Sequence, residues 1–130
     1  MHGVKKGEKT MKVIAVMSPK GGIGKTTTAD SIAYILGGEY KRKVLLIDGD
    51  PQGDTSKTYG AYDPEIGGMS YLLERGNSAG GSYDTASVIK ATAYKHIDII
   101  TANGYLMHTD ANLLVNQTDN QITRLRDALE

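Results

Sequence analysis

The segment that most constrains the fold is Lys20-Gly21-Gly22-Ile23-Gly24-Lys25-Thr26-Thr27, because of what stands on each side of it. Before it, Lys12–Met17 is β-branched and nearly continuous, which predicts a strand covered on both faces. After it, Lys25–Leu36 repeats apolar residues at intervals of three and four, which predicts a helix. The pair Gly37-Gly38 is a plausible stop for that helix. A glycine-rich loop is therefore expected between a buried strand and the start of a helix.

Such a loop has a direct use in binding anions. Glycines lack Cβ, so that successive backbone N–H groups can point inward and wrap a phosphate chain. Lys25 can reach the outer phosphates, and the Thr26 hydroxyl can ligate Mg²⁺. The helix N-terminus favours the same anion through its dipole and its free N–H groups. The alternative is a glycine-rich turn with a lysine for solubility, and the expected flanking strand and helix favour the phosphate loop.

Two further strands are predicted by short apolar runs. Val44–Ile47 reads as a buried strand that ends at Asp48-Gly49-Asp50-Pro51, and His96–Thr101 reads as a third strand. Residues 52–68 are rich in Gly, Thr, Ser and Asp and predict a long functional loop or a frayed helix. Strands that alternate with helices indicate an α/β fold with a doubly wound, mostly parallel sheet.

The helices expected in the second half are short. Met69–Glu74 predicts a helical turn, and Thr85–Thr92 predicts a short helix. Thr118-Asp119-Asn120-Gln121 has the spacing of a capping box. Ile122, Leu125 and Leu129 then line one face of a helix that runs to the last residue.

Composition excludes several classes of protein. The 130 residues include fifteen basic and fifteen acidic side chains and no cysteine. The neutral balance argues against a strongly basic DNA-coating protein and against an acidic tail, and the missing thiols exclude disulfides and iron–sulfur sites. The longest clean apolar run, Val13–Met17, is far shorter than the ~20 residues of a membrane span. Residues 1–11 are expected to be a disordered lead-in without a signal peptide, so we expect a cytoplasmic protein.

One departure from the common phosphate loop makes the motif more specific. The usual pattern has a glycine five residues before Gly24, where this chain has Pro19. This chain also has a lysine inside the loop, Lys20, which the usual pattern does not have. The segment 20–27 resembles the deviant Walker A motif of the ParA/MinD/Soj ATPases, which share a larger class with nitrogenase iron protein and the arsenite-pump ATPase. Val44–Gly53 resembles the A′ or switch I segment of that family, and its Asp-Pro-Gln is similar to the DNA-partition branch. Ile97–Asn103 is similar to the family's third strand, so the resemblance implies a P-loop NTPase fold.

The resemblance also implies roles for individual residues. Lys25 would bind the β- and γ-phosphates and Thr26 would hold Mg²⁺. Lys20 would be the signature lysine, which reaches across a nucleotide-sandwich dimer to the partner's ATP and stabilises the transition state. Asp50 would help to position the attacking water and Asp48 would lie near the Mg²⁺ shell; the alternative is an acidic turn that binds nothing. Backbone or hydroxyl contacts to phosphate are implied for Gly21, Gly22, Ile23, Gly24 and Thr27.

The function implied by the resemblance is plasmid or chromosome partition. The family uses ATP, Mg²⁺ and ATP-dependent homodimerisation, and a centromere-binding, ParB-like protein stimulates its slow hydrolysis. Association with the nucleoid would come from non-specific contacts with DNA. Two alternatives stay open at this point, a MinD-like membrane-cycling ATPase and a non-catalytic module that senses nucleotide.

The resemblance further implies that residues 12–130 are the N-terminal half of such a domain. The family's Walker B strand, its adenine contacts and its DNA-binding patch follow later in the chain, and turnover without Walker B is expected to be poor. In related folds the Walker B strand lies between the strands expected at 12–17 and 44–47, so its loss would leave unpaired strand edges. The two strands could pair directly, another chain could fill the gap, or the fold could be marginal. We expect intermolecular association or an altered strand order.

Overall fold

The computed structural model describes residues 11–75, 84–115 and 124–129. One three-stranded sheet has the order β1 (Val44–Ile47), β3 (Ile97–Ile100), β2 (Ile89–Ala91). β1 runs parallel to β3 and β2 runs antiparallel to it, so the described sheet is mixed. The strands expected at 44–47 and at 96–101 are both confirmed.

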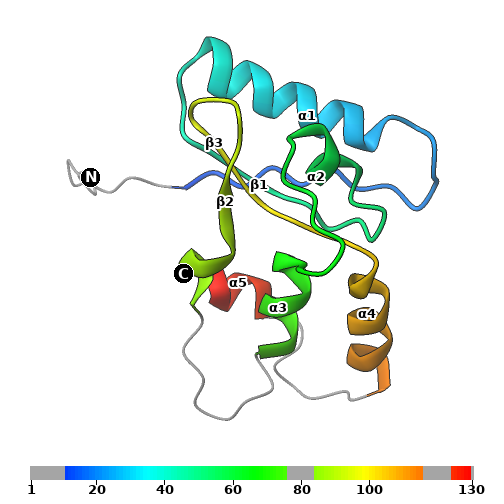
Figure 1. Ribbon diagram of the computed structural model, residues 1–130. Helices are drawn as coiled ribbons and strands as arrows, with labels where there is room; N and C mark the ends of the chain where they lie inside the picture. The colour runs from blue at the N-terminus through cyan, green and yellow to red at the C-terminus, as the bar shows by residue number, and fades with distance from the viewer. Residues whose placement is uncertain (1–10, 76–83, 116–123, 130) are drawn as a thin grey trace, which may run out of the picture.

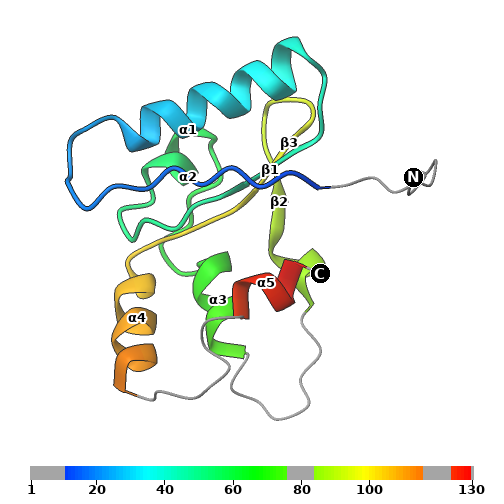
Figure 2. The same ribbon diagram turned by 180° about the vertical axis from the view of Figure 1, so that it is seen from behind.

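Helices lie on both faces of this sheet (Figures 1 and 2). One face carries α1 (Lys25–Tyr34), its π-helical continuation η1 (Ile35–Glu39) and α2 (Asp54–Thr58). The other face carries α3 (Gly68–Arg75), α4 (Tyr105–Val115) and α5 (Arg124–Leu129), and the 3₁₀ turn η2 (Thr85–Val88) leads into β2. Within the described ranges, no helix combines the length and the apolar character needed to cross a bilayer.

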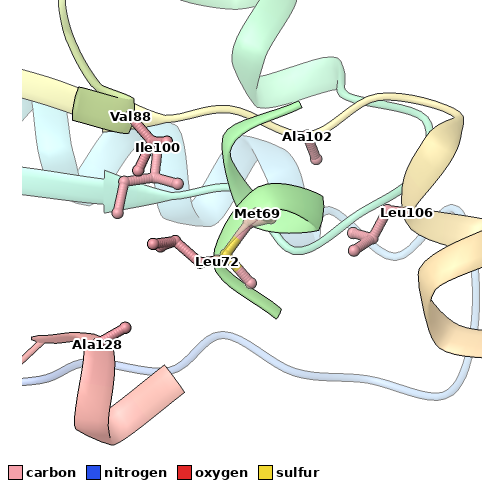
Figure 3. Packing of buried hydrophobic residues seen from close by; sticks show 7 residues of the cluster. All are labelled: Met69, Leu72, Val88, Ile100, Ala102, Leu106 and Ala128. Atoms are coloured by element: carbon pink, nitrogen blue, oxygen red, sulfur yellow. The ribbon is translucent and has the colours of Figure 1, made fainter. Parts of the chain in front are cut away.

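Strand β1 contributes side chains to two hydrophobic clusters because its residues alternate between the two faces of the sheet. Val44 and Leu46 pack against a cluster beneath α1, which consists of Ala33, Tyr59, Ile97 and Ile99. Leu45 and Ile47 pack against the cluster on the opposite face, whose buried members are Met69, Leu72, Val88, Ile100, Ala102, Leu106 and Ala128 (Figure 3). A parallel pair of strands covered on both faces is the arrangement of α/β proteins. The predicted fold class is therefore confirmed.

The strand expected at Lys12–Met17 is wrong. Residues 11–18 have no strand structure, and the side chains of Val13 and Met17 are 77% and 86% exposed. The possibility that this segment pairs directly with β1 is wrong as well, since the only strand partner of β1 in the described part of the chain is β3. An apolar run becomes a strand only when another strand satisfies its backbone hydrogen bonds. Association of chains at this edge stays a prediction.

Other sequence expectations meet mixed outcomes. The helical turn at 69–74 is confirmed by α3, and α5 confirms the last helix within its described residues. The helix expected over Thr85–Thr92 is wrong, because only a 3₁₀ turn forms there and residues 89–91 pair with β3. The expected long loop at 52–68 contains the short α2, and α4 was not foreseen. The predicted lead-in up to residue 10, the capping box and Ile122 lie outside the described residues.

The glycine pair at the end of α1 does not stop the helix. Gly37 and Gly38 lie inside η1, which continues the helical path to Glu39. Gly37 is needed there for space, because a Cβ on it would lie 2.5 Å from Cγ1 of Ile97 on β3. The glycine thus permits close packing of the helix on the sheet rather than helix termination.

The ends of β1 and β3 are tied together by the buried carboxylate of Asp48. Its Oδ2 accepts hydrogen bonds from the Ser56 backbone N–H at 2.9 Å and from the Ser56 hydroxyl at 2.6 Å. Its Oδ1 accepts the backbone N–H of Asp50 at 3.1 Å. The Ser56 Oγ in turn accepts the backbone N–H of Ala102 at 3.0 Å. One serine therefore joins the exit of β1, the helix α2 and the exit of β3.

We expect Ser56→Ala to destabilise the protein by about 2–6 kcal/mol. The change removes a donor to a buried carboxylate and leaves the buried Ala102 N–H without its acceptor, and each loss costs about 1–3 kcal/mol. Urea denaturation followed by circular dichroism measures the difference. The control Ser31→Ala changes an exposed serine on α1 and should stay within about 0.5 kcal/mol. A Ser56→Ala effect as small as that of the control would contradict the assigned role.

Gly53 at the start of α2 offers a second test of this region. Its φ is +65°, and a Cβ there would lie 2.8 Å from the carbonyl oxygen of Ala102. Gly60 has a similar φ of +68°, but none of the described residues beyond its neighbours comes within 4 Å of such a Cβ. Gly60→Ala should therefore lower the free energy of unfolding by about 1–2 kcal/mol, the cost of a left-handed conformation for a residue with a Cβ. Gly53→Ala should lower it by about 1–3 kcal/mol more, because its Cβ also meets the Ala102 carbonyl. Equal losses of stability in urea would show that the close approach to Ala102 is not a constraint.

Candidate nucleotide-binding site

The glycine loop opens directly into α1. Gly22 and Gly24 have φ values of +72° and +83°, a left-handed conformation that glycine adopts without strain. Gly24 is the N-cap of α1, and its carbonyl accepts the first helical hydrogen bond from the Thr28 N–H at 2.9 Å. Apart from the adjacent residues, no atom of the described chain lies within 4 Å of where a Cβ would stand on Gly21, Gly22 or Gly24. The backbone of the loop is thus accessible beside these three glycines.

The two lysines of the motif are placed differently. The Lys25 ammonium folds back into the loop, where it donates to the carbonyl oxygens of Lys20 at 2.9 Å and Ser18 at 3.2 Å. The Lys20 residue is exposed, and its ammonium makes no hydrogen bond or ion pair within the described residues. One cation is therefore held inside the loop while the other stays available to a molecule outside it.

The remaining residues of the motif line the start of α1. Thr26 is half-buried, and its hydroxyl makes no hydrogen bond with the residues that the structure describes. Thr27 and Ile23 are exposed. At the start of α1 the backbone N–H groups have no helical acceptor, so they favour an anion at this position.

The acidic loop after β1 lies at the same end of the sheet as the glycine loop (Figures 1 and 2). In this loop Asp48 is buried and holds Ser56, as described above. Asp50 is half-buried; its Oδ1 accepts the Gln52 N–H at 3.0 Å and its carbonyl accepts the Gly53 N–H at 2.9 Å. Neither carboxylate forms an ion pair with a lysine of the glycine loop in the described parts of the chain.

A residue that sequence reasoning missed is Ser56. It follows Asp48 by eight residues and lies on α2, so no local periodicity connects the two. The only hint in the sequence is the cluster of hydroxyl residues that follows Asp-Pro-Gln. Hydroxyl side chains near a strand end often bind backbone or carboxylate groups, but their number alone does not identify the partner.

The oxygen atoms near the loop suit a magnesium ion that arrives with a nucleotide. In the described residues no three His, Asp or Glu side chains gather as a metal-binding group. Mg²⁺ in nucleotide sites keeps several waters and takes one or two protein oxygens besides the phosphates, so a protein cage is not required. The unbonded hydroxyl of Thr26 and the carboxylates of Asp48 and Asp50 are oxygens of the required kind.

Comparison with known proteins places this site in a family. A family model described as an AAA domain matches residues 11–130. The sporulation initiation inhibitor protein Soj of Bacillus subtilis is 34% identical over 119 residues, which are 92% of this chain and 44% of Soj. The chromosome partitioning protein ParA of Myxococcus xanthus is 34% identical over 121 residues, 91% of this chain and 39% of ParA. The chain thus spans about two fifths of the length of these curated relatives.

A solved structure supports the same assignment. Cobyrinic acid a,c-diamide synthase from Mycobacterium smegmatis, crystallised with a bound ATP analog and magnesium, is 30% identical and superposes with a TM-score of 0.70. The match covers 87% of this chain and 43% of the synthase. Together with the family model and the likeness to Soj and ParA, it shows that the chain belongs to the AAA domain family and, within it, to the ParA-like P-loop ATPases.

Proposed function

We propose that the chain is the ATP-binding portion of a ParA-like ATPase that partitions plasmids or chromosomes. The observation that carries the proposal is the pair of lysines in one glycine loop, with Lys25 folded inward and Lys20 exposed. The name of the similar ParA, a chromosome partitioning protein, supports partition as the cellular role. In this role the protein works in the bacterial cytoplasm, in association with the nucleoid.

The loop binds the phosphates of ATP through backbone and cation together. N–H groups of Gly21, Gly22, Ile23 and Gly24, with the backbone and hydroxyl of Thr27, surround the phosphate oxygens. Lys25 exchanges two neutral carbonyl acceptors for charged phosphate oxygens, and hydrogen bonds between charged groups are about twice as strong as neutral ones. The inward position of its ammonium means that little rearrangement is needed.

Hydrolysis depends on the residues at the mouth of the loop. The Thr26 hydroxyl would bind Mg²⁺, and Asp48, whose oxygens are held by Ser56 and the Asp50 N–H, would lie near its coordination shell. When bound, the ion neutralises charge on the phosphates. Asp50 would orient the attacking water. The exposed ammonium of Lys20 would reach the ATP of a second copy and stabilise the charge that develops in the transition state.

Dimerisation and further partners follow from the same role. Two copies would face each other across their nucleotides, so that each supplies Lys20 to the other site. A centromere-binding, ParB-like protein would stimulate hydrolysis, and non-specific DNA would be bound outside the residues of this chain. These partners rest on the likeness to Soj and ParA.

Lys25→Ala should weaken ATP binding by about 10-fold to 100-fold, because it removes charge-assisted hydrogen bonds of about 1.5–3 kcal/mol. Titration of the 130-residue chain with a fluorescent ATP analogue in the presence of Mg²⁺ measures the dissociation constant. Lys43→Ala, which changes an exposed lysine before β1, is the matched control and should bind as the unchanged chain does. Equal affinity in the two variants would refute the phosphate role of Lys25.

Lys20→Ala separates binding from dimerisation. The variant should keep its affinity for ATP within about threefold but lose any nucleotide-dependent doubling of mass in light scattering, because its lysine acts on the other copy. Lys43→Ala again serves as the control. A dimer that forms equally without nucleotide would instead indicate pairing of strand edges, and a nucleotide-dependent dimer that survives Lys20→Ala would contradict the proposed role.

A further inference from the structure

An open cavity lies on the C-terminal half of α1, away from the glycine loop. Its volume is about 340 Å³, and it is bordered by α1, by the end of α2 and by the turn between β2 and β3. In Figures 1 and 2 this turn lies against the C-terminal half of α1. The polar and aromatic residues that line the cavity are Asp30, Ser31, Tyr34, Thr58, Tyr59 and Tyr94. None of these residues belongs to the candidate nucleotide-binding site.

Three tyrosine rings form one side of this cavity. The ring of Tyr94 stands edge-on to Tyr34, with 5.7 Å between centroids, and to Tyr59, with 5.4 Å between centroids. Tyr59 is buried, and its hydroxyl donates to the backbone carbonyl of Asp30 at 2.9 Å. Tyr34 and Tyr94 are 51% and 43% exposed. Large rings with exposed surface around a cavity attract cations through the negative charge of their faces.

A carboxylate completes the cavity. The Asp30 Oδ1 accepts the hydroxyl of Thr55 at 2.9 Å, and Asp30 has no cationic partner among the described residues. Partial burial raises the pKa of Asp30, the hydroxyls of Thr55 and Thr58 lower it in part, and the charge of Asp48 raises it further. Burial, with smaller contributions from Asp30 and Tyr94, raises the pKa of Tyr59 to about 12, so this phenol stays neutral.

The lining of the cavity carries charge of one sign. Among the described residues that line it, Asp30 is the only charged one, whereas the adjoining hollow that shares Tyr34 and Tyr94 also has Lys41 and Lys95 in its lining. A bound cation would restore the electrostatic balance that burial disturbs. A neutral aromatic or aliphatic ligand would leave the carboxylate uncompensated and further desolvated.

We propose that this cavity binds the guanidinium group of an arginine side chain of a partner. A guanidinium is planar and weakly hydrated, so it can lie against tyrosine rings while its N–H groups donate to the Asp30 carboxylate. An ammonium is compact and strongly hydrated, and it lacks the flat surface that packs on a ring. The shape and the charge of the cavity thus favour arginine over lysine.

The test uses small probes and the unchanged 130-residue chain without nucleotide. N-acetyl-L-arginine methylamide is titrated while the tyrosine ring signals are followed by NMR, with the uncharged citrulline analogue and the lysine analogue as matched probes. The arginine probe should shift the signals of Tyr34 and Tyr94 and saturate in the millimolar range. The lysine probe should bind at least threefold more weakly, and the citrulline probe should cause no saturable shift.

Two variants locate the site. Asp30→Asn keeps an oxygen for Thr55 but removes the charge, and it should weaken arginine binding at least fivefold. Tyr94→Leu should weaken it at least threefold. Their controls are Asp98→Asn, an exposed carboxylate on β3, and Tyr40→Leu, an exposed tyrosine outside the cavity, and both should bind as the unchanged chain does. If Tyr94→Leu does not fold, the nearly isosteric Asp30→Asn still decides the outcome.

Three results would overturn the proposal. Citrulline binding with the same half-saturation as arginine would show that the cavity does not recognise the positive charge of the ligand. Lysine binding as tight as arginine binding would remove the preference for guanidinium. Unchanged arginine binding in Asp30→Asn would place the cation elsewhere. Because no nucleotide is present, each result is independent of whether the chain binds ATP.

Discussion

The buried carboxylate of Asp48 is the interaction on which the arrangement of the site depends. It closes the end of β1 against α2 and, through Ser56, against the exit of β3. No cation takes part among the described residues; the charge is met by three N–H and O–H donors instead. A buried charge that is not satisfied in this way would be strongly destabilising. The acidic loop therefore has one favoured position, at the end of the sheet where the glycine loop also lies.

The helix α2 connects the acidic loop with the open cavity beside α1. Thr55 binds the carboxylate of Asp30 on α1, and the next residue, Ser56, binds the carboxylate of Asp48 below the acidic loop. Two adjacent hydroxyls on the short helix α2 thus hold two carboxylates on different elements. A change in the position of α2 would move both carboxylate contacts together, since one turn of helix carries them.

Short apolar runs and helical spacing in the sequence predicted those strands and helices that depend mainly on their own residues. The runs at 44–47 and 97–100 became strands because they are apolar, short and able to pair with each other. The equally apolar run at 12–17 did not, because pairing is a property of two segments and its partner is not among the described residues. Residues 89–91 became a strand by pairing with β3, against the expected helix. The helix α4 was missed, since its sequence shows little periodicity.

The residues of the candidate site and of the cavity beside α1 also fall into those that the sequence predicted and those that it did not. The glycine loop and its lysines were predictable because a phosphate loop is contiguous in sequence, and the structure places them at the start of α1 as expected. Ser56, which fixes Asp48, and the three tyrosines around Asp30 were not predictable, because they come together only through packing of α1, α2 and the turn before β3.

The exposed segment 11–17 affects more than the sheet edge, because it leads directly into the glycine loop. Lys25 fastens that side of the loop by holding the carbonyls of Ser18 and Lys20, and a bound phosphate would compete for the same ammonium. Ordering of the loop around a phosphate also restricts the segment that leads into it, and this restriction costs conformational entropy. Any strand that paired with residues 12–17 would remove this entropic penalty and would tighten phosphate binding without touching the ligand. Pairing of residues 12–17 with another strand and phosphate binding are therefore thermodynamically coupled, so that each favours the other.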